Sequence, residues 1–380
     1  MKRTRGFLRV AGLAAAVATT VSAGLVSAST AVAAPQAPGT VVRDVDLPAP
    51  ARLAAASGQR QLTYWTEGAT GEPALSTGSV YVPPGQAPAG GWPIVSFAHG
   101  TAGVGDDCAP SFVGDTPLTQ TFLTTLLNAG YAVVATDYVG LGTDGVHAYL
   151  HGRSEGAAVI DMVRAATSVD PDLSRRWMAV GHSQGGHATM FAAHAATRYA
   201  PELDFRGASA TGTPANLELA LLIGGPGFPN VGLNGLTAFA AFIIDGLRIA
   251  RPDLPIDDYL TPAGAELVRE SETTCYLPLV SRASEVGVGV GEMLSRPLAE
   301  PRIHDALNDY LAVPTSGYDR PLFLGHGLPD QTVPFPLGAK LAADLLVGGQ
   351  DVTARAYPGE HRVSFTQATP DVLAFVRAHL

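Results

Sequence analysis

The chain has 380 residues, of which 46% are hydrophobic and 15% are charged, and its 34 acidic and 24 basic side chains give a formal charge of −10. An acidic surface repels phosphate backbones, so this balance argues against a nucleic-acid-binding protein. A chain of this length also exceeds the ~250–300 residues at which single hydrophobic cores stop growing. We therefore expect a main domain that carries a substantial insertion.

The first residues have the pattern of a secretory signal peptide. Four basic side chains precede an apolar run at 10–26, and small residues follow at 29–34. This order predicts that residues 1–34 are a signal peptide, cleaved near Ala33 or Ala34, and that the mature protein is secreted and extracellular. The mature chain keeps 20 basic and 34 acidic side chains, a formal charge of −14. No later run reaches the ~20 apolar residues of a membrane span, so we expect no transmembrane segment in the mature form.

Strand-like and helix-like segments alternate along most of the mature chain. This alternation predicts an α/β fold with a mainly parallel sheet flanked by helices. The run 93–98 is almost continuously apolar, as is typical of a strand buried on both faces. The predicted strands are 77–82, 93–98, 131–137, 177–181, 321–325 and 352–357, and the predicted helices are 118–129, 155–169, 185–199, 337–347 and 365–379.

The alternation stops between residues 213 and 314. This segment is far longer than an ordinary loop. We predict that it is a mostly helical cap, inserted into a catalytic domain formed by 35–212 and 315–380. Its apolar run 236–250 lines an acyl pocket, makes a transient contact with a lipid interface, or forms the core of the cap itself, and the pattern leaves these alternatives open.

The pentapeptide Gly181-His182-Ser183-Gln184-Gly185 matches the G-x-S-x-G motif. In this motif the serine occupies a strained turn between a strand and a helix, and small neighbours let adjacent elements approach closely. Here the predicted strand 177–181 precedes the serine and the predicted helix 185–199 follows it. This context predicts the α/β-hydrolase fold with Ser183 as its nucleophile.

A serine hydroxyl needs a base to accept its proton, and in this fold the acid and then the histidine follow the serine along the chain. Asp330 comes just after the predicted strand 321–325, and His361 comes just after 352–357. Both positions are at the carboxyl ends of strands, where open α/β sheets place their sites. We therefore predict Asp330 as the acid and His361 as the base.

Other residues compete for these roles less well. Side chains that flank the nucleophile generally point elsewhere or pack, and a residue next to His361 is badly placed to contact its Nδ1 atom. The competing histidines are His182, His187 and His326, and the competing acids are Asp319, Asp344, Asp351 and Glu360.

Stabilisation of a tetrahedral oxyanion requires preorganised backbone N–H donors. One donor is expected at Gln184, directly after the nucleophile, and the other at Thr101, in the loop after strand 93–98. The histidines lack the companions of a zinc motif, and no phosphate-binding glycine loop is present. We therefore expect no metal and no cofactor.

The chain contains two cysteines, Cys108 and Cys275. In an oxidising compartment such a pair usually forms a disulfide, although two free thiols or one catalytic thiol are alternatives that the residues leave open.

Several motifs together resemble one family. They are Phe97-Ala-His-Gly-Thr101, Asp107-Cys-Ala-Pro-Ser111, the run 130–142 and the elbow around Ser183. With the late Asp330 and His361 they resemble the secretory lipase family, the lipase A-like branch of the α/β-hydrolases. The resemblance implies a cap inserted before the acid, a disulfide from Cys108 to Cys275, and hydrolysis of lipid or other carboxylic esters. It implies the same triad, with Thr101 and Gln184 around the oxyanion.

We therefore predict a secreted serine ester hydrolase, a lipase or esterase, that acts as a monomer on small-molecule or lipid esters through an acyl-enzyme. A peptidase or amidase on the same fold is the first alternative, with Asp257 and Asp258 as a candidate acidic pair for a substrate amino terminus. A non-enzymatic binding protein is the second alternative.

Overall fold

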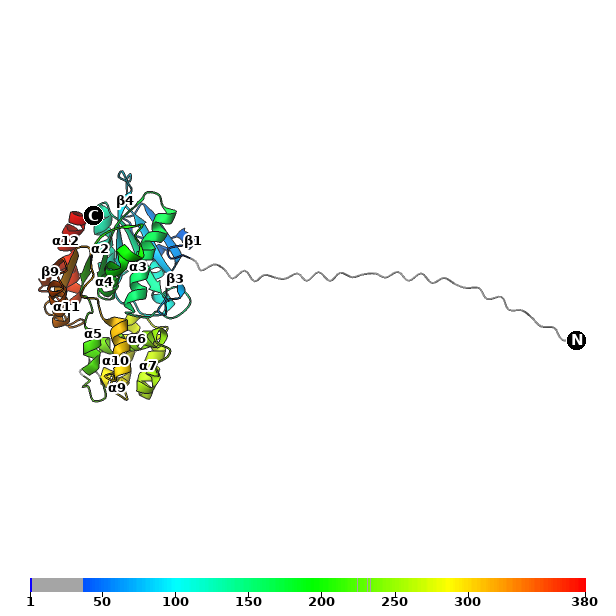
Figure 1. Ribbon diagram of the computed structural model, residues 1–380, viewed down its shortest axis with the longest axis vertical. Helices are drawn as coiled ribbons and strands as arrows, with labels where there is room; N and C mark the ends of the chain where they lie inside the picture. Colours follow the sequence, from blue (N-terminus) through cyan, green and yellow to red (C-terminus); the bar gives the residue numbers. More distant parts are fainter. Residues whose placement is uncertain (2–36, 224, 231, 233) are drawn as a thin grey trace. The chain divides into compact units, whose positions relative to one another are not determined.

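The computed structural model describes Met1 and residues 37–223, 225–230, 232 and 234–380 (Figure 1). The predicted signal peptide, 1–34, therefore lies outside the described residues apart from Met1. Within the described part, no helix has the length and apolar character needed to cross a membrane.

The centre of the fold is a single sheet, in which the described residues form nine strands in the order β1-β2-β3-β5-β4-β6-β7-β8-β9. The first pairings, from β1 to β5, are antiparallel, and all the pairings from β5 through β4 to β9 are parallel. The predicted mainly parallel sheet is thus confirmed. The strands are β1 (Val41–Asp46), β2 (Gly58–Glu67), β3 (Pro73–Val82), β4 (Trp92–Ala98), β5 (Ala132–Val139), β6 (Leu173–His182), β7 (Asp204–Thr211), β8 (Leu322–Gly327) and β9 (Val352–Tyr357).

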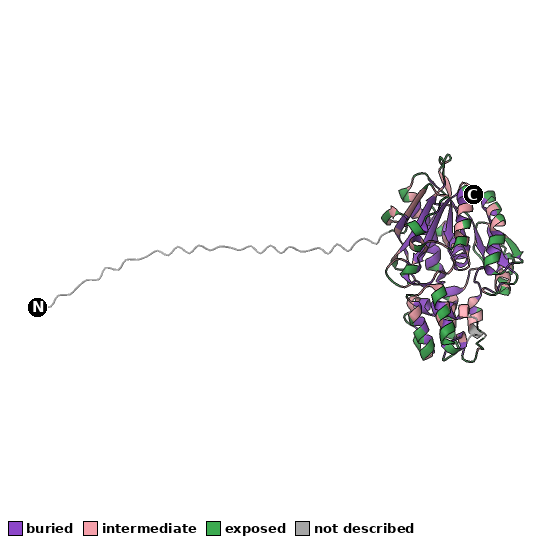
Figure 2. Cartoon of the chain, turned by 180° about the vertical axis from the view of Figure 1, so that it is seen from behind, coloured by how far each residue is buried: buried purple, intermediate pink, exposed green. Residues whose placement is uncertain are grey.

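Helices cover both faces of this sheet, and the strands between them are largely buried (Figure 2). Alternate residues of a strand point to opposite faces, so in β4 Ile94 packs in one core cluster and Val95 in the other. The two layers bury both faces of the central parallel strands, whereas the edge strand β9 is mostly exposed. The helices on the Ile94 side are α3 (Gly152–Val169), α4 (Gln184–Tyr199) and α11 (Phe335–Val347), and those on the Val95 side are α2 (Pro117–Asn128) and α12 (His361–His379).

The chain between β7 and β8 forms helices and, among its described residues, no strand of the sheet. These helices have a core of their own, which includes the buried side chains of Phe242, Leu267 and Leu307. We call residues 213–314, the segment predicted to be a cap, the helical segment. Its α-helices are α5 (Leu217–Ile223), α6 (Asn234–Ala250), α7 (Pro262–Ser271), α8 (Tyr276–Val286), α9 (Val290–Met293) and α10 (Pro301–Leu311).

A disulfide between Cys108 and Cys275 joins the helical segment to the loop after β4. Next to it, the Tyr276 N–H donates to the Ala102 carbonyl at 2.9 Å, and Gly103 and Cys275 form an isolated β-bridge. The bond closes a loop of 167 residues, which in the chain-entropy model stabilises the fold by about 5 kcal/mol. The loop that carries Thr101 is therefore fixed to the start of α8.

Candidate active site

Ser183 lies on a sharp turn between β6 and α4. Its backbone has φ 58° and ψ −126°, a strained conformation for a residue with a side chain, and its N–H donates to the Thr211 carbonyl at 2.9 Å. The turn needs glycine around it: a Cβ atom at Gly185 would lie 1.8 Å from the Ala98 carbonyl oxygen, and one at Gly181 would lie 2.1 Å from the carbonyl oxygen of Gly185. The glycines of the motif therefore let the turn pack directly against the end of β4.

Asp330 and His361 meet at the same edge of the sheet. Asp330 follows β8, and His361 follows β9 as the first residue of α12. The Nδ1–H of His361 donates to Asp330 Oδ2 at 2.7 Å, while Asp330 Oδ1 accepts the N–H groups of Thr332 and Val333 at 2.9 and 2.8 Å. Both carboxylate oxygens are thus engaged, and the proton on Nδ1 leaves the lone pair of the imidazole on Nε2.

The imidazole of His361 lies beside the serine turn. Its ring centroid is 4.6 Å from that of His182, the residue before Ser183. Its Nε2 atom is buried and has no hydrogen-bond partner among the residues described. A Cβ atom at Gly212, which has φ +55°, would lie 2.8 Å from His361 Cε1. Because Gly212 has no side chain, the imidazole of His361 can pack directly against it.

The two residues expected at the oxyanion are also on this turn or next to it. Gln184 is the first residue of α4, and the first N–H groups of a helix have no partner within the helix. A Cβ atom at Gly100 would lie 3.5 Å from Ser183 Cβ, which places the Gly100–Thr101 step against the turn. The hydroxyls of Thr101 and Tyr149 are hydrogen-bonded at 2.6 Å.

Ser183 opens into an apolar cavity of about 210 Å³. One wall comes from α6, through Leu236, Phe239, Ala240 and Ile243. Other residues of α6, such as Phe242, are buried in the core of the helical segment. One side of α6 therefore faces the cavity beside Ser183, and the other side packs inside the helical segment.

Residues 114–379 match the family described as secretory lipase. The chain belongs to the secretory lipase family. Lipase A from Moesziomyces aphidis is 27% identical, over 86% of this chain and 72% of that protein. The X-ray structure of Candida antarctica lipase A in its closed state, 24% identical, has a TM-score of 0.72 and covers 90% of this chain and 82% of that chain. The α/β-hydrolase prediction is confirmed.

A relative from Mycobacterium tuberculosis, 27% identical over 83% of this chain and 72% of that protein, is named a probable inactive lipase. Ser183, Asp330 and His361 all lie within the part of this chain that matches the family.

The competing histidines have other contacts. His182 Nδ1 lies 3.0 Å from Thr211 Oγ1, and burial lowers the pKa of this histidine well below its usual value. His187 Nε2–H donates to the Leu311 carbonyl at 2.8 Å, and His326 Nε2–H donates to the Val333 carbonyl at the same distance. His326 also lies 3.5 Å from Asp330, behind the acid.

The acid that contacts His361 Nδ1 is Asp330 and not one of its competitors. Asp319, Asp351 and Glu360 are exposed, and Asp344 forms an ion pair with Lys340 at 2.5 Å. Within the described chain, no group of three or more His, Cys, Asp or Glu side chains is arranged to hold a metal ion.

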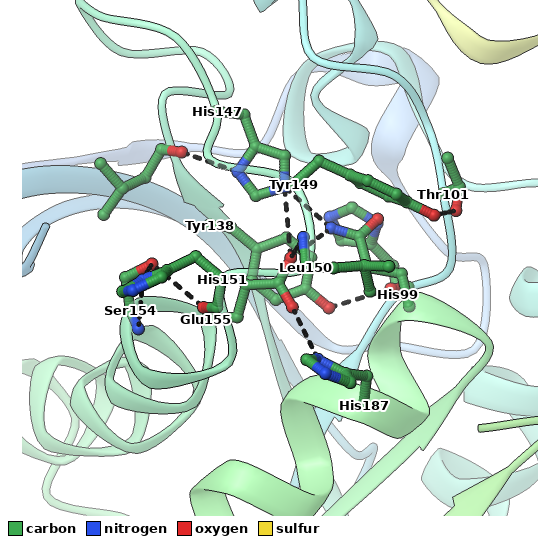
Figure 3. A network of polar contacts seen from close by, with 12 residues as sticks. His99, Thr101, Tyr138, His147, Tyr149, Leu150, His151, Ser154, Glu155 and His187 are labelled. Carbon is green, nitrogen blue, oxygen red and sulfur yellow. Dashed lines mark hydrogen bonds and ion pairs between the residues drawn. The ribbon is translucent and has the colours of Figure 1, made fainter. Parts of the chain in front are cut away.

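The sequence missed a buried polar network behind the serine turn, centred on Glu155 (Figure 3). Burial tends to raise the pKa of this carboxyl, but its interactions with the imidazoles of His147 and His187, 3.4 and 3.8 Å away, outweigh burial and lower the pKa to about 2. The one signal in the sequence is a glutamate at the start of a helical run, 155–166, whose other residues are small or apolar except Asp161 and Arg164. That signal alone does not identify its partners.

Proposed function

We propose that this protein is a secreted serine carboxylic-ester hydrolase that cleaves esters of apolar acids through an acyl-enzyme on Ser183. The observation that supports this most is the pairing of His361 with Asp330 at 2.7 Å beside a strained serine that opens into an apolar cavity. Within the family the remaining choice is between lipase and esterase. An apolar cavity accommodates the acyl chain in either case.

The proposed reaction has two halves. His361 Nε2 accepts the proton of the Ser183 hydroxyl while Oγ bonds to the ester carbonyl carbon, and the oxyanion is held by the N–H groups of Thr101 and Gln184. When the C–O bond to the alcohol breaks, the alcohol oxygen takes the proton from His361. Water then attacks the acyl-enzyme by the same route, and the carboxylic acid and the free serine are released. Asp330 holds the imidazole and stabilises its charged form.

The helical segment 213–314 serves in this proposal as the cap that encloses the acyl chain. Helix α6 provides one wall of the cavity, and α5 and α9 contribute Leu217 and Val290. Each methylene group that leaves water is worth about 0.8 kcal/mol, which is about fourfold in kcat/KM. The rate should therefore rise with acyl length until the cavity is full.

Secretion fits the same proposal. The disulfide between Cys108 and Cys275 suits an oxidising compartment, and residues 1–34 have the composition of a signal peptide. The peptidase alternative finds no such support, since Asp257 is exposed and paired with Arg248 at 3.0 Å, and neither Asp257 nor Asp258 lines the Ser183 cavity.

The decisive experiment compares the unchanged protein with Ser183→Ala on p-nitrophenyl esters of two to sixteen acyl carbons, below and above the micellar limit. We expect the variant to lose at least about 10⁴-fold in kcat and to melt at a similar temperature. Labelling by a fluorophosphonate probe should occur in the unchanged protein only. Substantial turnover by a folded Ser183→Ala variant would reject the nucleophile, and faster cleavage of matched anilides than of esters would favour the amidase.

The acyl-length series also separates a lipase from an esterase. Preference for long chains that increases above the micellar limit indicates a lipase, whereas preference for short chains without that increase indicates an esterase.

A further inference from the structure

The carboxylate of Glu155 connects two parts of the chain that approach the active site from different directions (Figure 3). Glu155 lies in the first turn of α3, and its side chain is fully buried. Its Oε1 atom accepts the Leu150 backbone N–H at 2.9 Å and a side-chain N–H of Gln184 at 2.7 Å. A single oxygen therefore holds the segment before α3 and the residue that follows the nucleophile.

The segment before α3 continues this connection to Thr101. Tyr149 precedes Leu150, and its hydroxyl is hydrogen-bonded to Thr101 at 2.6 Å. The Tyr149 carbonyl in turn accepts the hydroxyl of Tyr310 at 2.7 Å. Glu155 is thus linked directly to Gln184 and, through Leu150 and Tyr149, to Thr101. These are the two residues expected to bind the oxyanion.

The hydrogen bonds of His147 fix the orientation of the Gln184 amide. His147 Nδ1–H donates to the Val139 carbonyl at 2.9 Å, so its Nε2 atom is an acceptor for the second side-chain N–H of Gln184 at 2.8 Å. The NH₂ group of Gln184 consequently donates both protons, one to His147 and one to Glu155. A reversed amide would place its carbonyl oxygen against the carboxylate and is disfavoured.

The other carboxylate oxygen, Oε2, faces His187. Its distance from His187 Nδ1 is 3.8 Å, and the opposite ring nitrogen of His187 donates to the Leu311 carbonyl at 2.8 Å. Neither Oε2 nor this Nδ1 has a hydrogen-bond partner in the described part of the chain. Oε1 therefore makes the directional hydrogen bonds, and only Oε1 reaches the oxyanion residues.

We propose that Glu155 is a positioning residue that holds the backbone N–H groups of Gln184 and Thr101 in place for the oxyanion. The inference rests on the proposed function, because it assigns a role in the same ester cleavage. Oxyanion donors act only when they are preorganised at hydrogen-bond distance from the developing charge, and a displacement of about 1 Å can cost on the order of 100-fold in rate. Loss of Glu155 should therefore lower kcat and leave KM almost unchanged.

Two substitutions at Glu155 test whether its hydrogen-bond acceptor or its negative charge is needed. Glu155→Ala removes the acceptor, and we expect kcat to fall about 100-fold on the best p-nitrophenyl ester. Glu155→Gln keeps a carbonyl oxygen that accepts the same two N–H groups and turns its amide toward His187 Nδ1. We expect Glu155→Gln to retain a kcat close to that of the unchanged protein.

Asp161→Ala is the matched control. Asp161 is a fully buried carboxylate on the same helix, but it accepts from Thr66, Arg164 and Tyr199, away from the serine turn. This variant should lose stability, measured by thermal melting, without a specific loss of kcat. If Glu155→Ala does not fold, Gln184→Leu tests the same inference. Gln184→Leu removes the side-chain hydrogen bonds of Gln184 to Glu155 and His147 but keeps its backbone N–H. It should show the same loss of kcat at constant KM.

Binding of an alkyl trifluoromethyl ketone gives a readout that needs no turnover. Its adduct with Ser183 carries an oxyanion, whereas the corresponding alkyl alcohol occupies the cavity without forming one. We expect Glu155→Ala to weaken inhibition by the ketone about as much as it lowers kcat/KM, and to leave binding of the alcohol unchanged.

Several outcomes would overturn the inference. They are equal losses of kcat in Glu155→Ala and Asp161→Ala, a change confined to KM, a Glu155→Gln variant as slow as Glu155→Ala, or unchanged affinity for the ketone. Failure of the proposed function looks different, since the unchanged protein would then hydrolyse none of the esters.

Discussion

The sheet region and the helical segment contribute differently to this molecule. Every candidate catalytic residue follows a parallel strand of the sheet. Ser183, Asp330 and His361 follow β6, β8 and β9, of which β6 and β8 are hydrogen-bonded to a strand on each side. The helical segment has its own apolar core and contributes most of the cavity wall, through α5, α6 and α9. On the proposed function, the reaction is carried out by the sheet region and the acyl chain is selected by the helical segment, so each property should change without the other.

The largest effect is expected on the sheet side, at Asp330. Asp330→Asn keeps the shape of the side chain but removes the charge that stabilises the imidazolium of His361, and a loss of about 10⁴-fold in kcat is expected. Steady-state kinetics on short and long esters should show the same factor for both. A loss that differs strongly with acyl length would contradict the separation of the two regions.

The next effect concerns acid stability and Glu155. Its pKa is lowered from 4.5 to about 2, so its contribution is fully present above pH 4.5 and disappears as the pH falls toward 2. Ionisation of Glu155 should account for a few kcal/mol of the stability that is lost between pH 4.5 and 2, and this pH-dependent loss should be absent in Glu155→Gln. Urea unfolding at a series of pH values measures it.

Asp161→Asn is the control for this measurement. Burial raises the pKa of Asp161 to about 6, so this group makes stability fall as the pH rises from about 4 to 6, the opposite direction. If the free energy of unfolding decreases equally steeply with falling pH in the unchanged protein and in Glu155→Gln, Glu155 does not contribute to this pH dependence.

A smaller and more selective effect is expected in the helical segment, at Ala240. Ala240→Leu places extra carbon atoms in the cavity, whereas Ala241→Leu makes the same change at a buried position that does not line the cavity. If two methylene groups of the substrate are displaced, kcat/KM for long-chain esters should fall about 15-fold relative to short-chain esters. Ala241→Leu should lower the melting temperature but keep the acyl-length profile. Identical acyl-length profiles for both variants would show that α6 does not contact the acyl chain.

The smallest effect is expected at Asp245, a buried carboxyl of α6. Burial and then the nearby Glu272 raise its pKa from 3.8 to about 7, and Arg248 lies 3.4 Å away. Because its folded-state pKa is raised, stability should fall as the pH rises from about 4 to 7. Asp245→Asn should therefore stabilise the protein by about 1 kcal/mol at pH 8 and very little at pH 4. Thermal melting at both pH values tests this, and an equal shift at both would refute it.

The sequence predicted most of the sheet region, because its strands are apolar and alternate with helices. Three strands were missed for identifiable reasons. The strand β1 is mostly exposed and mixes charges with valines, and β2 begins with Gly, Gln and Arg. In β7 the only aromatic or β-branched residues are Phe205 and Thr211, so the signal of a strand is weak. The helix α12 begins at His361 rather than 365, because its first turn carries little apolar periodicity.

The positions of Ser183, Asp330 and His361 were predictable because each follows a strand that can be recognised locally. The Glu155 network was not, since its hydrogen bonds join residues far apart in the chain, such as Thr101 with Tyr149 and Gln184 with Glu155. Helical periodicity also indicates that α6 is buried without telling which of its sides faces the cavity.

The disulfide also turns part of the chain into a covalent ring. The ring runs from Cys108 to Cys275 and contains Ser183, whereas Asp330 and His361 lie on the tail that leaves it. A protease that cuts once within the ring leaves every part of the chain attached. A single cut between Cys275 and Asp330 instead disconnects the acid and the histidine from the nucleophile. Single cuts that separate both Asp330 and His361 from Ser183 are thus confined to the end of the helical segment after Cys275 and the chain from there to Asp330.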